Sequence, residues 1–345
     1  MTSSPPIPAQ MRAVVLDDYR PDVEAAIAGL AVASMPVPRP DPGEVLVRME
    51  AAPVNQSDLL FLQGLYGVRK SLPAVPGWEG AGTVVASGGG WFARSMHGRR
   101  VACSGQSDAG GTWAEYFVAP AQQCVPLHRD VDFELGANSV VNPLTALGLL
   151  EMIRQGKHRA ALQNAAVSQV GLMMTRLCRD AGIPLINVVR REEQARILRE
   201  QNEPHVLDSS AAGYDEALRS LAHELRATIA FDAVAGEMTG RLLDALPAGG
   251  SAVVYGALSN EKCRELDPIG LIFAGKRVEA FYLGEWIKRK SFVSTLRIVR
   301  RSQALIAAGT LRTSVARRIP LSGLREGLLN YVRNLSEGKA ILLLR

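Results

Sequence analysis

The sequence predicts an α/β protein of two domains, one with a doubly wound parallel sheet and one that is β-rich. Three observations support this fold class. The 345 residues exceed the length of one average domain. Residues 128–299 alternate short apolar runs with helix-like segments, as expected of a parallel sheet. Residues 1–127 instead contain short apolar strands separated by Pro- and Gly-rich turns.

The first domain is expected to consist of short strands and irregular connections. Strands are predicted at 11–16, 44–51 and 82–86, where β-branched and other apolar residues cluster between turn residues. Pro36-Val-Pro-Arg-Pro-Asp-Pro would form a stiff connector, since each proline fixes its own backbone angle.

The second domain is predicted from six strands in strict alternation with helices, which is typical of a doubly wound sheet. The strands are expected near 160–164, 184–189, 205–208, 228–234, 251–256 and 278–283. Residues 300–345 contain helices and a last apolar strand at 340–344, too little for a domain, so we expect this segment to return to the first domain.

Composition restricts the function classes. Apolar residues make up 47% of the chain and charged residues 21%, which is ordinary for a soluble globular protein. The net charge of +5 is mild, and no basic run is interleaved with aromatic residues, so nucleic acid is not an expected partner. The positive balance suits a polyanionic cofactor or substrate.

Cellular location is also suggested by the sequence. No apolar run is long enough to cross a bilayer, and residues 1–8 resemble neither a signal nor a transit peptide, so no membrane association is expected. The four cysteines are scattered without ligand spacing, and we expect buried or half-buried thiols in a reducing compartment. A cytoplasmic enzyme is predicted.

Residues 159–191 form the most informative stretch. An apolar run leads to a turn of small residues at 164–168, then to a helix and a second β-branched run at 184–189. The apolar face of the helix consists of Val170, Met174, Leu177 and Ala181. A turn that opens a helix presents backbone N–H groups and the positive end of the helix dipole, so a dinucleotide pyrophosphate fits there.

The second run of this unit ends on Arg190 and Arg191, where an NAD-binding unit places an acidic residue on the ribose 2′-hydroxyl. Two guanidiniums suit a 2′-phosphate, which indicates NADPH. The alternative is that residues 190–193 form a solvated turn with local ion pairs. The glycine fingerprint is only partial, because Asn164, Ala166 and Gln169 occupy its positions and a glycine stands only at Gly171.

The stretches 54–59, 63–67 and 72–85 resemble the medium-chain dehydrogenase/reductase superfamily. In its zinc alcohol dehydrogenases a Cys stands where Gln56 stands and a Gly-His-Glu triplet where Gly77-Trp78-Glu79 stands, so both ligand positions are lost here. A catalytic zinc needs about three protein ligands. We therefore expect no metal, and a structural, domain-spanning role for the Glu79 carboxylate.

Within the superfamily the chain is most similar to the zinc-independent 2-enoyl thioester reductases of the mitochondrial type and their bacterial relatives. The stretches that carry this similarity are 63–67, 141–146, 162–165, 187–190, 254–256, 281–286 and Lys339. The resemblance implies a GroES-like catalytic domain at 1–127 and a Rossmann NADPH-binding domain at 128–299, with 300–345 returning to the first.

The resemblance also implies functional residues. It assigns catalysis to Tyr66. NADPH contacts are implied for Asn142, Thr145, Val167, Ser168, Gln169, Val170, Arg190, Arg191, Glu192, Tyr255, Gly256, Ala257, Leu258, Phe281, Tyr282, Leu283, Gly284 and Lys339. The implied reaction is NADPH-dependent reduction of an enoyl-CoA or enoyl-acyl-carrier-protein thioester. A tyrosine hydroxyl, neutral at pH 7, can donate to the developing enolate oxygen or relay a proton to the α-carbon.

Several alternatives stay open from the sequence. Tyr66 could be a loop tyrosine packed against the domain seam, Asn142 a helix N-cap before Pro143, and Lys339 an exposed lysine before a strand. A quinone or enone reductase would use the same cofactor residues without Tyr66. A non-catalytic NADPH-binding protein is the third possibility.

Three residues depart from the family pattern. Gln169 stands where a glycine is usual and would crowd a bound pyrophosphate, Tyr282 replaces a tryptophan near the acyl pocket, and Trp78 is uncommon at its position. The family also implies a homodimer, for which residues 278–283 would supply an apolar edge strand that is open to pairing.

Overall fold

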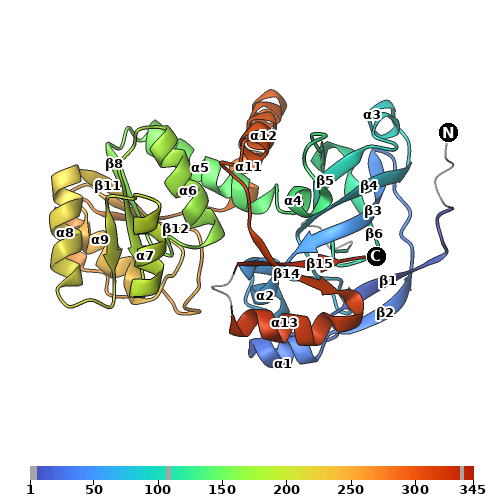
Figure 1. Cartoon of the computed structure of the whole chain (residues 1–345), viewed down its shortest axis with the longest axis horizontal. Coiled ribbons are helices and arrows are strands. Elements are labelled where there is room, and N and C mark those ends of the chain that lie inside the picture. Colours follow the sequence, from blue (N-terminus) through green and yellow to red (C-terminus); the bar gives the residue numbers. More distant parts are fainter. Residues whose placement is uncertain (1–5, 106–109, 335–337) are drawn as a thin grey trace. The chain divides into compact units, whose positions relative to one another are not determined.

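The computed structural model describes residues 6–105, 110–334 and 338–345 (Figure 1). The chain divides into unit 1, which comprises Met1–Val141 and Gln303–Arg345, and unit 2, which comprises Asn142–Ser302. The sequence-based boundaries lie at 127/128 and 299/300, so the structure moves residues 128–141 into unit 1. In the described parts of the chain, no helix combines the length and the apolar character needed to span a bilayer.

Unit 2 is built on one parallel sheet of six strands in the order β10-β9-β8-β11-β12-β13. The strands are β8 (Ala160–Gln163), β9 (Leu185–Val189), β10 (Val206–Asp208), β11 (Ala227–Asp232), β12 (Ser251–Val254) and β13 (Arg277–Ala280). The chain moves outward from β8 to β10, then restarts at β11 on the other side of β8. This reversal makes the sheet doubly wound and creates a topological switch point between β8 and β11.

The helices of unit 2 alternate with these strands. They are α5 (Val141–Gln155), whose first residue belongs to unit 1, α6 (Gln169–Asp180), α7 (Glu192–Glu200), α8 (Tyr214–Leu225), α9 (Glu237–Ala245), α10 (Pro268–Phe273), α11 (Leu283–Lys288) and α12 (Phe292–Ala307), which ends in unit 1. Buried aliphatic residues of α8 and α9 pack on the sheet and form one core layer. The predicted α/β class is confirmed.

The sixth strand is shorter than the sequence predicts. The expected strand 278–283 ends at Ala280, because Tyr282 caps α11 and the chain turns helical at Leu283. All four residues of β13 are exposed, so this edge strand is not buried by its own chain. The other five strands lie where the sequence places them, within one or two residues.

Unit 1 contains a seven-stranded sheet in the order β14-β15-β3-β4-β5-β7, with β6 paired to β3, and a separate antiparallel pair β1-β2. The strands are β1 (Gln10–Val15), β2 (Ala31–Pro36), β3 (Glu44–Pro53), β4 (Glu79–Ser87), β5 (Arg100–Ser104), β6 (Tyr116–Pro120), β7 (Cys124–Pro126), β14 (Val315–Pro320) and β15 (Lys339–Leu343). The C-terminal strand β15 lies between β14 and β3.

Short helices surround this sheet. They are α1 (Val23–Ala28), α2 (Gln56–Leu62), α3 (Trp91–Ser95), α4 (Phe133–Ala137) and α13 (Leu324–Arg333), with single 3₁₀ turns η1 (Ala121–Gln123) and η2 (Leu321–Gly323). The core of unit 1 contains large aromatic side chains, Phe61, Trp78 and Trp113, all almost fully buried. Three of the cysteines are buried as expected, but Cys263 is exposed, because it lies in the loop after β12 rather than in an element.

Candidate functional site

The carboxyl ends of β8 and β11 meet at the switch point of unit 2 and are joined by side chains. The Asn164 amide donates to Asp232 Oδ1 at 2.6 Å and accepts from the Ala233 N–H at 2.8 Å. Asp232 in turn accepts from the N–H groups of Val234 and Ala235 and from the Thr239 hydroxyl. Asn164, which stands at a glycine position of the dinucleotide fingerprint, therefore links the ends of β8 and β11 by hydrogen bonds of its side-chain amide.

The turn between β8 and α6 approaches the start of the helix closely. Ala165 adopts a left-handed backbone angle of 48°, and a Cβ at Gly171 would lie 2.6 Å from the Ala166 carbonyl oxygen. Gly171 is therefore sterically required. Ser168 caps α6 by accepting from the Gly171 N–H at 3.1 Å, which uses one of the first donors of the helix.

A buried polar cluster that was not predicted from the sequence supports this turn. Gln163 Nε2 lies within 2.8–3.1 Å of three acceptors, the Gly171 carbonyl, the Thr175 hydroxyl and Asn187 Oδ1, and all of these groups are buried. The sequence signal for this cluster was the presence of two amide side chains, Gln163 and Asn187, within otherwise apolar strands. The cluster fixes the distance between β8, β9 and α6, while Val167, Ser168, Gln169 and Val170 remain half-buried above it.

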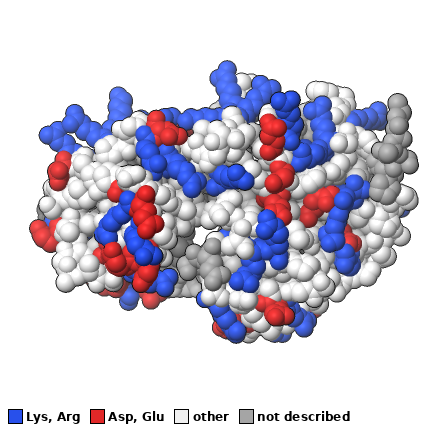
Figure 2. All heavy atoms as spheres, viewed as in Figure 1, with Lys and Arg blue, Asp and Glu red and all other residues white. Residues whose placement is uncertain are grey.

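Arg190 and Arg191 follow β9 directly, and both are exposed. Neither guanidinium pairs with a carboxylate in the described parts of the chain; Glu192 instead pairs with Arg199 at 2.5 Å and Arg196 with Glu200 at 3.6 Å. Figure 2 shows basic and acidic side chains interleaved over the region of α7. Among the described residues, no ion pair of Arg190 or Arg191 closes this turn, although both are solvated and Glu192 forms a local ion pair; binding of an anion by the two arginines remains a prediction.

Residues 255–258 follow β12 at the same edge of the sheet. The Tyr255 hydroxyl is buried without a hydrogen-bond partner among the described residues, and burial raises its pKa. A buried hydroxyl of this kind normally has a partner, so a ligand or water is expected beside it. A Cβ at Gly256 would lie 2.7 Å from the Ala233 carbonyl, so this position also requires glycine. Ala257 is half-buried and Leu258 is 43% exposed.

Of the residues that follow β13, Phe281 packs against a helix and Tyr282 is exposed. The Phe281 ring lies against α5, where a Cβ at Gly148 would come within 2.4 Å of it, and its centroid is 6.1 Å from that of Trp286. Tyr282 is 40% exposed and precedes the first turn of α11, which contains Leu283 and Gly284. Phe281 thus has a packing role that the sequence does not reveal.

The proposed N-cap role of Asn142 is wrong, because α5 begins one residue earlier, at Val141. The first N–H groups of the helix are taken by a carboxylate from another element. Glu79 Oε2 accepts from the N–H groups of Val140 and Val141 at 3.0 and 2.8 Å. Asn142 lies half-buried within the first turn, and Thr145 is buried one turn later.

In unit 1, Glu79 belongs to a buried group of charges. Its Oε1 accepts from the Asn55 side-chain amide at 3.0 Å, and Oδ1 of the same amide accepts a short hydrogen bond from the Lys339 ammonium. Glu79 and Lys339 are both almost fully buried. Lys339 is therefore not an exposed lysine, and its ammonium is engaged within unit 1. Its predicted contact with NADPH remains a prediction.

Asp58 completes this group. Its Oδ2 accepts from the Asn55 N–H at 2.6 Å, while Oδ1 is buried without a partner among the described residues. Burial raises the pKa of Asp58 to about 7, against the pull of the Asn55 N–H and Lys339. Burial lowers the pKa of Lys339 to about 8, against the pull of Glu79 and Asp58.

A raised carboxyl pKa predicts a pH-dependent stability. Between pH 4 and 7 the unfolded chain releases the Asp58 proton while the folded chain retains it, so this residue destabilises the fold increasingly as pH rises through that window. We expect the stability of Asp58→Asn relative to wild type to increase from pH 4 to pH 7, measured as the difference in urea midpoint. A difference that is constant with pH would contradict this expectation.

Tyr66 lies on the loop between α2 and β4, and its ring packs on Trp78 with centroids 5.0 Å apart. The Tyr66 N–H donates to the Leu60 carbonyl at 3.2 Å, which fixes the backbone of the loop. Tyr66 is half-buried, so its ring is partly held and partly accessible. The structure thus shows the packing contact, and the catalytic role of Tyr66 stays a prediction.

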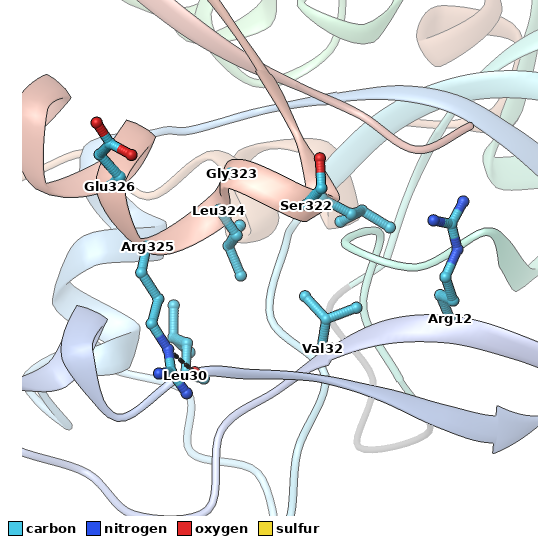
Figure 3. Close-up of a pocket in the computed structure, with 9 residues that line it drawn as sticks. Arg12, Leu30, Val32, Ser322, Gly323, Leu324, Arg325 and Glu326 are labelled. Atoms are coloured by element: carbon cyan, nitrogen blue, oxygen red, sulfur yellow. Dashed lines mark hydrogen bonds between the residues drawn. The ribbon is translucent and has the colours of Figure 1, made fainter.

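A surface hollow of about 470 Å³ also lies in unit 1, and its lining contains no predicted site residue (Figure 3). It is lined by Arg12, Leu30, Val32 and residues 321–326. Its arginines are engaged, since Arg12 pairs with Glu115 at 2.7 Å and Arg325 donates to the Leu30 carbonyl at 2.6 Å. We therefore do not assign the functional site to this hollow.

The two lost zinc-ligand positions have other surroundings. Trp78 is buried among aromatic rings, and Gln56 is the first residue of α2. We expect metal analysis of chelator-washed protein to find less than stoichiometric zinc, and activity to survive chelation. One zinc per chain, or activity lost on chelation, would contradict this prediction.

Comparison with known proteins agrees with this architecture. Residues 41–129 match the alcohol dehydrogenase GroES-like domain, and residues 170–300 match the family described as zinc-binding dehydrogenase. The mitochondrial enoyl-[acyl-carrier-protein] reductase of Xenopus tropicalis is 30% identical over 91% of each chain. The human enzyme of the same name is 27% identical over 87% of this chain and 80% of its own.

Solved structures show the same fold. A putative NADPH:quinone reductase from Mesorhizobium loti superposes with a TM-score of 0.91 at 32% identity, over 98% of this chain and 99% of its own. The Escherichia coli quinone oxidoreductase complexed with NADPH has a TM-score of 0.82 at 22% identity, over 96% and 99% of the two chains. A nucleotide-binding sheet with a GroES-like domain defines the class of two-domain dehydrogenases and reductases. The chain belongs to the zinc-independent branch of the medium-chain dehydrogenase/reductase superfamily and is an oxidoreductase.

Proposed function

We propose that the protein uses NADPH to reduce a 2-enoyl thioester, carried on CoA or on an acyl carrier protein, to the saturated acyl thioester. The observation that carries this proposal is the position of Tyr66, a half-buried tyrosine on a loop with a fixed backbone. The enoyl-[acyl-carrier-protein] reductases among the relatives support the substrate class.

The cofactor part of the proposal rests on unit 2. Arg190 and Arg191 would bind the 2′-phosphate as paired guanidiniums. The start of α6 would face the pyrophosphate, and the Tyr255 hydroxyl, which has no partner in the described part of the chain, would donate to a ligand beside β12. These donor groups fit a phosphorylated dinucleotide. Gln169 is the exception, because its side chain stands where close approach to a pyrophosphate favours glycine.

The chemistry requires one proton-bearing group. When bound, NADPH supplies the hydride that adds to the β-carbon of the thioester. Negative charge then develops on the thioester oxygen, and the hydroxyl of Tyr66 donates to that oxygen or relays a proton to the α-carbon. The buried ring of Trp78 keeps one side of the Tyr66 ring away from water.

A panel of acceptors tests the proposal. We expect NADPH oxidation that depends on crotonyl-CoA and yields butyryl-CoA, with little oxidation in the presence of a simple quinone or without an acceptor. Good turnover with the quinone and none with crotonyl-CoA would instead establish a quinone or enone reductase. That second candidate is favoured by the likeness to the Mesorhizobium loti protein. Binding of NADPH without turnover of any acceptor would indicate a non-catalytic protein.

A homodimer is part of the proposal, because β13 is the last strand of its sheet and pairs on one side only among the described residues. Exposed apolar side chains lie on β13 and the preceding α10, including Val278, Ile272 and Phe273, the last 78% exposed. We expect light scattering at micromolar concentration to give twice the chain mass of 37.1 kDa. Phe273→Glu should weaken the dimer. A wild-type monomer would remove this claim.

A further inference from the structure

An aromatic cluster surrounds Trp78 in unit 1. Trp78 is 1% exposed, and its ring lies 5.0 Å from Tyr66 at an interplanar angle of 38° and 5.2 Å from Phe61 at 76°. The Phe61 ring contacts Tyr19 edge-on at 5.5 Å. Edge-on and tilted pairs of this kind are favourable and directional, so Trp78 restrains the orientation of the rings around it.

A buried cation completes the cluster. Lys70 is 4% exposed, and its ammonium lies 5.0 Å from the centroid of Trp78 and 5.6 Å from that of Phe61. It also donates to the Val75 carbonyl at 3.1 Å and to the Gly110 carbonyl. Burying an ammonium is costly unless it is solvated by such groups, and cation–π attraction is strongest where water is excluded.

The loop that carries Tyr66 is fixed at both ends. Gln63 Nε2 donates to the Pro21 carbonyl at 2.7 Å, and Arg69 donates to the Gly64 carbonyl at 2.8 Å. At the far end, the backbone N–H of Lys70 donates to the Tyr19 hydroxyl at 2.9 Å. The backbone therefore has little freedom, and the orientation of the Tyr66 ring depends on what it packs against.

We propose that Lys70 and Trp78 form a platform that sets the position of the Tyr66 hydroxyl, with Lys70 acting through Trp78 as a positioning residue. This inference rests on the proposed function of Tyr66. The ammonium holds the Trp78 ring, and the ring holds Tyr66 in one orientation before substrate binds. A displacement of about 1 Å at a reacting group can cost a hundredfold in rate, so such restraint has a measurable effect. The platform also gives a role to Trp78, a residue type that is uncommon at this position in the family.

Activity measurements separate positioning from support of the fold. Lys70→Met keeps an unbranched side chain of nearly the same length but removes the cation, and we expect kcat for crotonyl-CoA to fall about 10- to 100-fold with KM within about twofold of wild type. Lys70→Arg should recover most of the rate, since a guanidinium also binds aromatic faces. Trp78→Phe should resemble Lys70→Met. Trp91→Phe is the matched control, because Trp91 is 82% exposed on α3, and it should keep the wild-type rate.

Two further measurements distinguish a positioning role of Lys70 from support of the fold. In a Tyr66→Phe background, Lys70→Met should cause no additional loss of kcat, since a platform without its hydroxyl has nothing to position. Hydrogen exchange of residues 63–70, which needs no substrate, should be at least several-fold faster in Lys70→Met than in Lys70→Arg, with the rest of unit 1 unchanged.

The outcomes distinguish this inference from the proposed function. Folded Lys70→Met protein with wild-type kcat and unchanged exchange of residues 63–70 would overturn the platform. Exchange that rises throughout unit 1 would also overturn it, because Lys70 would then support the fold as a whole. A fully active Tyr66→Phe variant would instead refute the role of Tyr66 itself, while the exchange result would still report on the platform.

Discussion

Replacing Tyr66 with phenylalanine is expected to lower kcat for crotonyl-CoA by about 10²–10³-fold, the usual cost of removing one donor to a developing oxyanion. Phenylalanine preserves the ring that packs on Trp78, so the fold and the aromatic contact should remain. The affinity for NADPH should stay near its wild-type value, since the predicted cofactor contacts come chiefly from unit 2. Steady-state kinetics and fluorescence titration of NADPH measure the two quantities separately.

Trp91→Phe serves again as the control for an aromatic substitution outside the predicted site. If Tyr66→Phe keeps most of its enoyl-CoA activity, Tyr66 is a packing residue and another group must supply the proton. If it loses quinone and enoyl-CoA activity equally, the tyrosine supports the fold or the cofactor rather than the enolate.

Substitution of Arg190 by alanine is expected to raise the dissociation constant for NADPH about tenfold or more and to leave that for NADH nearly unchanged. A hydrogen bond to a charged group contributes about 1.5–3 kcal/mol, and only NADPH carries the 2′-phosphate. Because Arg190 and Arg191 have no carboxylate partner among the described residues, their removal should leave no unpaired acid behind. The double substitution with Arg191→Ala should abolish the preference for NADPH.

Arg196→Ala is the matched control, because Arg196 is an exposed arginine of α7 that already pairs with Glu200. It should change neither dissociation constant. An equal loss of NADPH and NADH affinity in Arg190→Ala would mean that the arginine shapes the end of β9 rather than reading the phosphate.

The sequence alone was sufficient to predict the βαβ unit of residues 160–189 and the α/β class. Its signal is local, because β8 and β9 are short runs in which every residue is buried, and the buried residues of α6 recur with the period of a helix. The tyrosine loop, the two arginines after β9 and the strand ends could be located for the same reason, since each follows an element that the pattern already defines.

Contacts between distant segments could not be predicted in this way. Glu79 caps α5 from β4, which is why Asn142 is not the cap, and Lys339 is buried because β15 places it beside Asn55. The strand predicted at 278–283 is longer than the observed β13, because α11 begins at Leu283 and Tyr282 is already its N-cap residue. For Glu79 and Lys339 the deciding group is far away in the chain, whereas α11 directly follows the strand that it shortens.

The sequence by itself therefore determined the fold class, the family and the residue types available for phosphate binding and proton donation, because these follow from local patterns and motifs. Only the tertiary structure decided which side chains are already engaged. It paired Glu192 with Arg199 rather than with the neighbouring arginines, and it placed Lys70 over Trp78. Burial and charge pairing depend on segments brought together by folding, and no local pattern records them.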